Sequence, residues 1–180
     1  MTSGAPMEAA QIRQYLREVA DELHPSGTQH VLVMVGGALL AWHGLRDATR
    51  DIDSVRRFDE ELAEAVRRVA ERHDLAPEWI NYHAAAFLPQ TFVFEECELL
   101  IDHDRLRVLG APLRQVFLMK LRAGRAQDHE DLVAIWPFAG LTPEQAVADY
   151  WKAYPGAPDD EFLLSWVEQI AARAANDNTT

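Results

Sequence analysis

Apolar and polar residues follow one another in the first third of the chain with the spacings of helices and strands. Residues 9–23 carry apolar side chains three or four positions apart, which predicts an amphipathic helix that Pro25 ends. Residues 30–35 form a short run rich in valine and leucine, which predicts a buried strand. A short helix over residues 38–43 and a second strand over residues 51–55, paired with the first, are expected to follow.

The rest of the chain predicts a mixed sheet and then helices. A helix is expected over residues 58–73, where Asp59 can cap the first turn. Further strands are expected over residues 91–95, 98–101 and 105–109, the last two joined by a turn at Asp102, His103 and Asp104. Further helices are expected over residues 113–122, 128–136, 143–152 and 160–174, with breaks at Pro137, Gly140 and residues 155–158. We therefore predict an α/β (α+β) fold in one compact unit, with a core over residues 1–136 and a helical cap over residues 137–180.

Composition narrows the class of protein. The chain of 180 residues has a formal net charge of −12, which argues against a protein that coats nucleic acid non-specifically. Its longest apolar stretch, residues 31–42, contains two glycines and is too short to cross a membrane. Cys97 is the only cysteine, and the N-terminus lacks the pattern of a secretory signal. We expect a cytoplasmic protein with no membrane partner.

Two aspartates occupy alternate positions of the second predicted strand. Residues two apart in a strand project from the same face, so Asp51 and Asp53 are expected side by side, with Ile52 in the core. Two carboxylates this close repel each other unless a cation lies between them, and Mg²⁺ prefers carboxylate oxygens. The pair therefore predicts a magnesium site, although an Asp-Ile-Asp triplet by itself is also typical of a solvated strand edge.

Two glycines, Gly36 and Gly37, follow the first predicted strand. A backbone without side chains lets amide groups approach phosphate oxygens, and the next helix presents its positive N-terminal end to the same anion. A triphosphate and a metal would then meet at one place. A Gly-Gly pair alone is typical of an ordinary turn, so this interpretation depends on its combination with the aspartates.

In combination, these residues resemble the nucleotidyltransferases of the DNA polymerase β-like superfamily, and within it the AbiEii-type toxin-like branch. The resemblance lies in the Gly-Gly turn, in Arg46 and Thr49, and in the Asp51-Ile52-Asp53 strand. It implies a polymerase β-like core with a mixed sheet and flanking helices. It also implies that Asp51 and Asp53 hold Mg²⁺ or Mn²⁺, and that Gly36, Gly37, Arg46 and Thr49 bind a nucleoside triphosphate.

A second block, residues 118–132, resembles the later motif of the same superfamily. Lys120 is a point charge suited to a β- or γ-phosphate, and Arg125 could add to that clamp. Asp128 and Asp131 lie three apart and share a helix face, so one of them could accept a proton or orient Lys120. An ordinary salt-bridged helix is the alternative. Gln127 stands where relatives usually place a basic residue, which puts substrate recognition in doubt.

A third metal-binding carboxylate, which many polymerase β-like enzymes have, cannot be assigned from the sequence. Glu98, Asp102 and Asp104 are the candidates, and the last two also fit a simple hairpin turn. Arginines gather near the predicted site in an otherwise acidic chain, at positions 46, 50, 56 and 57.

The sequence therefore predicts a nucleotidyltransferase in which an acceptor hydroxyl attacks the α-phosphate of a nucleoside triphosphate, with Asp51, Asp53, Lys120 and Asp128 as catalytic residues. By analogy the acceptor is RNA, such as a transfer RNA end, or a protein hydroxyl, and the protein is a toxin with a cognate antitoxin. Two alternatives remain. One is a non-catalytic nucleotide- or partner-binding module of the same fold. The other is an enzyme that adenylylates a cationic small molecule such as an aminoglycoside.

Overall fold

The computed structural model describes residues 5–177. Its contacts divide the chain into two compact units. The first unit contains the chain up to Ala86 together with Glu95–Ala111, and the second contains Phe87–Phe94 and the chain from Pro112 onward. Residues 112–136 therefore group by their contacts with the helices that follow residue 136.

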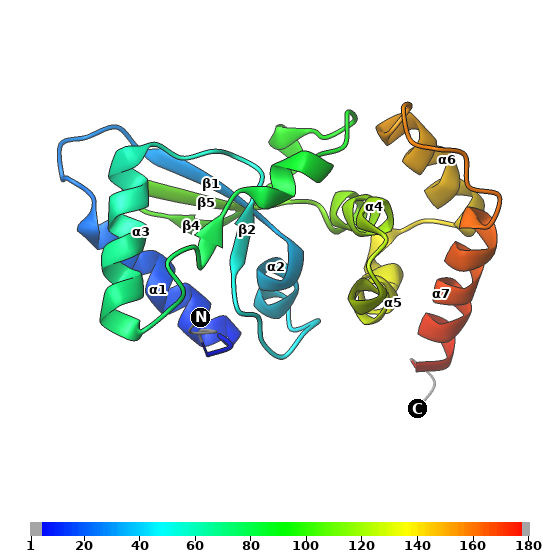
Figure 1. Ribbon diagram of the computed structural model, residues 1–180, viewed down its shortest axis with the longest axis horizontal. Helices are drawn as coiled ribbons and strands as arrows, with labels where there is room; N and C mark the ends of the chain where they lie inside the picture. The colour runs from blue at the N-terminus through cyan, green and yellow to red at the C-terminus, as the bar shows by residue number, and fades with distance from the viewer. Residues whose placement is uncertain (1–4, 178–180) are drawn as a thin grey trace. The chain divides into compact units, whose positions relative to one another are not determined.

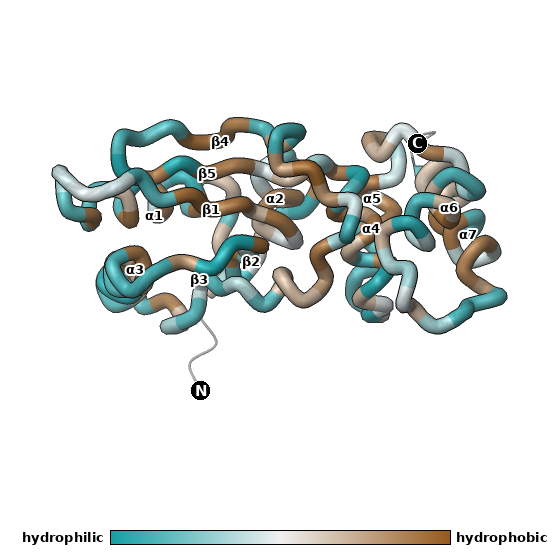
Figure 2. Tube along the Cα trace, turned by 90° about the horizontal axis from the view of Figure 1, so that it is seen from above, coloured by the Kyte–Doolittle hydropathy of each residue, from teal (hydrophilic) through white to brown (hydrophobic). Residues whose placement is uncertain are grey.

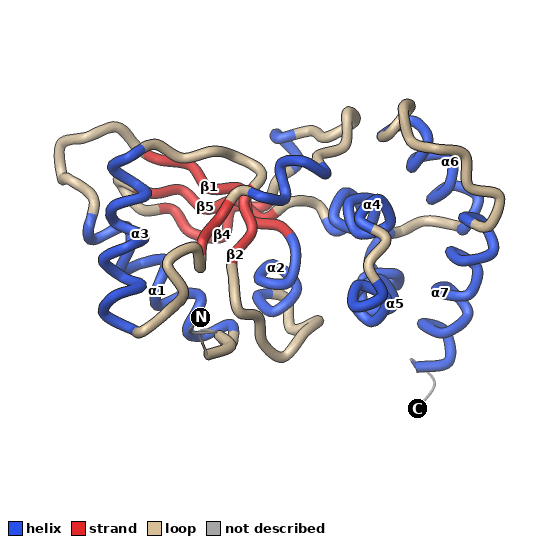
Figure 3. The backbone as a smooth tube through the Cα atoms, viewed as in Figure 1, coloured by secondary structure: helices blue, strands red, loops and turns tan. Residues whose placement is uncertain are grey.

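A five-stranded mixed sheet, drawn in red in Figure 3, forms the centre of the first unit, and its strand order is β3-β2-β1-β5-β4. The strands are β1 (His30–Val35), β2 (Ile52–Ser54), β3 (Ile80–Asn81), β4 (Glu98–Asp102) and β5 (Leu106–Gly110). β1 runs parallel to β5 and antiparallel to β2, while β3 is parallel to β2 and β4 is antiparallel to β5. The predicted mixed sheet and the pairing of the first two strands are thus confirmed.

Three helices of the first unit are α1 (Ala9–Glu22), α2 (Gly36–Trp42) and α3 (Glu60–His73), shown in Figure 1. α1 buries the stripe predicted from its period, including Ile12, Leu16 and Val19. α3 begins where Asp59 caps it, since the carboxylate accepts a 3.1 Å hydrogen bond from the amide of Leu62. In Figure 2 the tube of β1 is largely brown, in keeping with a strand whose side chains are mostly buried.

The second unit is helical, as predicted. Its α-helices are α4 (Leu113–Ala123), α5 (His129–Ala139), α6 (Pro143–Ala153) and α7 (Leu163–Asp177). α6 begins with a capping box, in which Thr142 and Gln145 each bond the other's backbone amide, and Pro143 occupies the first turn. Over the residues that the structure describes, no helix is long and apolar enough to span a membrane.

Two local predictions are wrong. Residues 91–95 do not form a strand: they lie in a loop and at the start of a short 3₁₀ helix, Phe94–Glu96, where the rings of Phe92 and Phe94 pack with centroids 4.8 Å apart. The run is apolar because its aromatic side chains pack on each other, not because it joins a sheet. Pro137 does not break α5, which continues to Ala139. A proline this close to the end of a helix removes one hydrogen bond without ending it.

Candidate functional site

Of the two predicted aspartates, Asp53 lies on β2 and Asp51 directly precedes it, while Ile52 between them faces the core. Ile52 is 1% exposed and lies in register with Ile80 of β3. Asp53 lies between Val35 of β1 and Asn81 of β3, its in-register neighbours, while Asp51 is exposed just before the strand. The alternation of buried and accessible positions that the sequence predicts is present.

Gly36 begins α2 directly against Asp53. Its φ angle is +64°, in the left-handed region that favours glycine. A Cβ atom placed on Gly36 would lie 2.8 Å from Oδ2 of Asp53, closer than real side-chain carbons approach. The turn between β1 and α2 therefore requires a glycine for two reasons, its backbone conformation and its contact with the carboxylate.

Gly37 packs against Arg46 and Thr49. A Cβ atom here would lie 2.9 Å from Oγ1 of Thr49 and 3.2 Å from Nη1 of Arg46. Thr49 is buried, and its hydroxyl donates to the backbone oxygen of Asp51 at 3.2 Å and lies 3.4 Å from Oδ1 of the same residue. Arg46 donates from Nε to the carbonyl of Ala48 at 3.0 Å.

Six of the eight residues that the sequence predicted for the nucleotide and the metal lie in the first unit and come together there. They are Gly36, Gly37, Arg46, Thr49, Asp51 and Asp53. They come from the β1–α2 turn and from the connection that leads into β2, which are adjacent because β1 and β2 pair.

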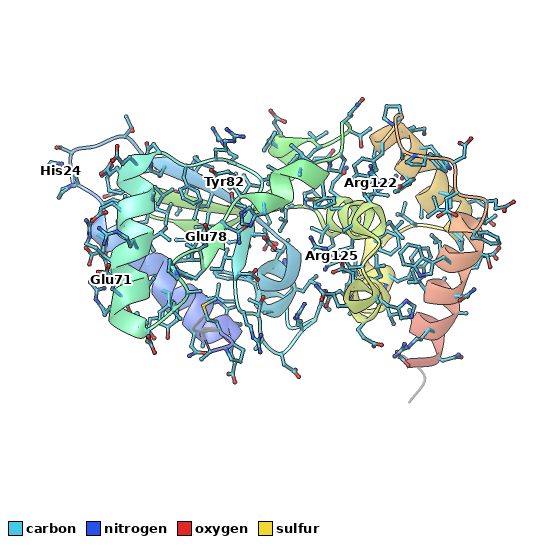
Figure 4. The ribbon with its side chains drawn as sticks, viewed as in Figure 1. His24, Glu71, Glu78, Tyr82, Arg122 and Arg125 are labelled. Carbon is cyan, nitrogen blue, oxygen red and sulfur yellow. The ribbon has the colours of Figure 1, made fainter. Side chains whose placement is uncertain are left out.

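Lys120 of the second unit lies between two carboxylates. Its ammonium nitrogen is 2.7 Å from Oδ1 of Asp128 and 2.8 Å from Oδ2 of Asp131. All three side chains are at most 10% exposed. Buried charges cost free energy unless they are paired, so the two aspartates stabilise the lysine side chain and hold its orientation. Arg125 is exposed, with its guanidinium 5.7 Å from the ring centre of Phe87 (Figure 4), and Gln127 is exposed beside Asp128.

Residues 12–135 match the profile of a family described as a nucleotidyltransferase of unknown function, DUF6036. The chain belongs to this family. The match covers both the aspartate pair and the Lys120 cluster, and it supports the nucleotidyltransferase class without assigning a branch. No curated protein and no solved structure matches the chain.

Among the candidates in this nucleotidyltransferase for a third carboxylate, none lies on a strand next to β2. Glu98 and Asp102 are on β4, which β1 and β5 separate from β2. Glu98 lies 3.5 Å from Nε2 of His43, Asp102 accepts a 3.2 Å hydrogen bond from Arg107, and Asp104 is exposed in the turn before β5. Within residues 5–177, no three acidic, histidine or cysteine side chains gather into a metal cluster.

The two aspartates are residues of the type that holds a magnesium ion. Mg²⁺ is commonly bound by one or two carboxylates, with phosphate oxygens of the substrate and water completing its shell. Asp53 on β2 and Asp51 directly before it could supply two such carboxylates, and Thr49 donates a hydrogen bond to the backbone oxygen of Asp51.

Asn81 is a neighbour of Asp53 that sequence reasoning missed. It lies in register with Asp53, is 7% exposed, and belongs to a strand of only two residues. So short a strand has no periodicity that a sequence could reveal. The only local sign of a buried strand is the apolar pair Trp79-Ile80 that directly precedes Asn81, and both side chains are buried.

Proposed function

We propose that this nucleotidyltransferase is metal-dependent and moves a nucleoside monophosphate from a nucleoside triphosphate to an acceptor hydroxyl. The observation that carries the proposal is the close packing of Gly36 against Asp53. A Cβ atom added to Gly36 would lie only 2.8 Å from the carboxylate oxygen Oδ2 of Asp53. In this contact a side-chain-free backbone turn lies directly beside the carboxylate of Asp53, two residues after Asp51. Phosphate oxygens can approach such a turn while the carboxylates share a cation with them.

In the proposed reaction the acceptor oxygen bonds to the α-phosphorus and its proton passes to solvent, while the bond from that phosphorus to the oxygen that bridges the α- and β-phosphates breaks and pyrophosphate leaves. Asp51 and Asp53 would hold Mg²⁺ or Mn²⁺, which when bound neutralises charge on the phosphate oxygens. Thr49 would keep Asp51 in place through its 3.2 Å hydrogen bond. Gly36 and Gly37 would offer backbone to the triphosphate, with Arg46 beside Gly37.

The second unit contributes to this proposal through Lys120, Arg125 and Asp128. Their roles toward the leaving pyrophosphate stay predictions from the sequence. The buried pairing of Lys120 with Asp128 and Asp131 supports a lysine held in a fixed orientation, as a phosphate contact requires.

We further propose, on the resemblance to the AbiEii-type branch, that the acceptor is a transfer RNA or another RNA, or a protein hydroxyl, and that a cognate antitoxin binds the chain. The exposed arginines at positions 50, 56 and 57 support an anionic acceptor.

Two observations favour other functions. The exposed Gln127 favours a binding module without turnover, as does the distance of the third-carboxylate candidates from β2 in the strand order; these are Glu98, Asp102 and Asp104. The net charge of −12 favours a cationic small-molecule acceptor.

The proposal is tested by incubating the full chain with each labelled nucleoside triphosphate, Mg²⁺ or Mn²⁺, and total transfer RNA, a protein extract or an aminoglycoside. Asp51→Asn and Asp53→Asn should each lower label transfer at least about a hundredfold, since one carboxylate of the metal site is lost. Asp74→Asn is the matched control, because this exposed residue has a φ of 53°, which asparagine tolerates. Equal labelling by the wild type and Asp53→Asn, or no labelling of any acceptor, would contradict catalysis.

A further inference from the structure

The side of the site opposite the glycine turn is formed by β3. Asp53 has the backbone of β1 on one side and Asn81 on the other, because β2 lies between β1 and β3. Residues in register on neighbouring strands project from the same face of a sheet. Asn81 therefore shares the face of Asp53, just as Ile52 and Ile80 share the buried face.

The amide of Asn81 is oriented by the backbone that follows it. Its Oδ1 atom accepts a 2.9 Å hydrogen bond from the amide of His83, which is an Asx-turn. Among the residues that the structure describes, nothing accepts a hydrogen bond from Nδ2, although the residue is 93% buried. Because Nδ2 is not one of the enclosed unpaired atoms of the described residues, it reaches solvent and can donate to a ligand oxygen.

Tyr82 comes next and presents an aromatic ring at the surface (Figure 4). Phe58 packs edge-on against this ring with centroids 5.5 Å apart, and the guanidinium of Arg57 lies 5.5 Å from its centre. These contacts hold the ring in place, yet the residue is still 40% exposed. A fixed, exposed aromatic ring beside an arginine is a surface on which a nucleobase stacks.

We infer that Asn81 and Tyr82 form the second wall of the nucleotide site, in which Nδ2 of Asn81 donates to a phosphate oxygen beside Asp53 and the ring of Tyr82 stacks on the nucleobase. This inference rests on the proposed function, because it takes the nucleotide at Asp53 as given. Consecutive Cα atoms lie 3.8 Å apart, so the residue that would contact the base directly follows, in the chain, the residue that would contact the phosphate. A nucleotide carries its phosphates and its base on the same sugar, so a single nucleotide can contact two adjacent residues.

Two substitutions separate the two contacts. Asn81→Asp keeps an oxygen that accepts from the amide of His83, so the turn is preserved, while it replaces the Nδ2 donor with negative charge. Tyr82→Leu keeps an apolar side chain but removes the aromatic face, and Tyr82→Phe restores that face without the hydroxyl. Thermal unfolding of each variant checks that the fold is retained.

Equilibrium binding of the magnesium complexes of ATP, GTP, CTP and UTP is compared with binding of magnesium tripolyphosphate, which has no base. Tyr82→Leu should weaken binding of at least one nucleotide about tenfold and leave tripolyphosphate unchanged, while Tyr82→Phe should bind like the wild type. Asn81→Asp should weaken both kinds of ligand at least about tenfold, because a hydrogen bond to a charged oxygen is lost and a repulsive charge is added.

The possible failures are distinct. If the wild type binds the nucleotides, but Tyr82→Leu binds every one of them equally well or Asn81→Asp binds tripolyphosphate as tightly as the wild type, the inference is overturned and the proposed function stands. If the wild type binds neither the nucleotides nor tripolyphosphate, the proposed function is overturned, and the inference with it.

Discussion

At the scale of single residues, Gly36 has the strictest requirement in the site. Its φ of +64° costs a side-chain-bearing residue about 1–2 kcal/mol. Gly44 has a similar φ of +72°, but a Cβ atom there would meet nothing within 4 Å. The two glycines therefore share a backbone conformation that strains other residues, and they differ in the contact with Asp53.

Gly36→Ala and Gly44→Ala form a matched pair for this contact. Both should lower the free energy of unfolding by about 1–2 kcal/mol, measured by urea denaturation. Gly36→Ala should also reduce nucleotide transfer, or Mg²⁺–nucleotide affinity, at least about tenfold, because its methyl group must displace the Asp53 carboxylate. If Gly44→Ala impairs function as strongly, strain alone explains the loss and the contact has no functional role.

At the scale of elements, α1 and α3 are joined by an ion-pair network. Glu18 on α1 accepts hydrogen bonds from His73 at 2.7 Å and Arg72 at 2.9 Å on α3, and from Gln14 on its own helix. Burial alone would raise the pKa of Glu18, but these hydrogen bonds, that from His73 foremost, more than offset it and lower the pKa from 4.5 to about 2.

This lowered pKa predicts an acid-sensitive contact between the two helices. The Glu18 stabilisation is fully present above pH 4.5 and is lost as the pH falls toward 2, because in that range the unfolded chain binds a proton that the folded chain does not. The free energy of unfolding, measured with urea across pH 2–7, should depend less steeply on pH in Glu18→Gln than in the wild type. The difference in slope should reach up to about 1.4 kcal/mol per pH unit. Glu78→Gln, at an exposed residue, is the control. A slope in Glu18→Gln equal to that of the wild type would contradict this role.

At the scale of the whole molecule, the second unit includes a short segment of chain that interrupts the sequence of the first unit. Residues 87–94 belong to the second unit although residues on both sides of them belong to the first. The carbonyl of Phe87 accepts a 2.6 Å hydrogen bond from the hydroxyl of Tyr154, and the amide of Gln90 donates to the carbonyl of Ala153 at 3.0 Å. Burial raises the pKa of the Tyr154 hydroxyl, which keeps it protonated as this donor.

Removing this donor should loosen the inserted segment. Tyr154→Phe is expected to lower the free energy of unfolding by about 1 kcal/mol and to speed hydrogen exchange at the amide of Gln90. Tyr150→Phe is the matched control, because Tyr150 is a buried neighbour whose hydroxyl makes no hydrogen bond within the described part of the chain. Unchanged exchange at Gln90 in Tyr154→Phe would show that other contacts hold the segment.

Local sequence by itself determined the elements whose pattern repeats over several residues. α1 and α3 follow from apolar side chains at helical spacing, and the Asp59 cap follows from one residue in the right place. The neighbourhood of Gly36 and Asp53 was also predictable, because a short strand, a glycine turn and a second strand leave β1 and β2 few ways to pair. These features depend on interactions between residues near one another in the chain.

The tertiary structure alone decided which distant strands became neighbours. β3 joins β2 and brings Asn81 beside Asp53, while β4 takes the far edge and carries Glu98 and Asp102 away from it. It also decided that residues 91–95 stay outside the sheet and that Lys120 is enclosed by both aspartates. Strand order and register depend on the packing of residues far apart in sequence, and no short pattern records that packing.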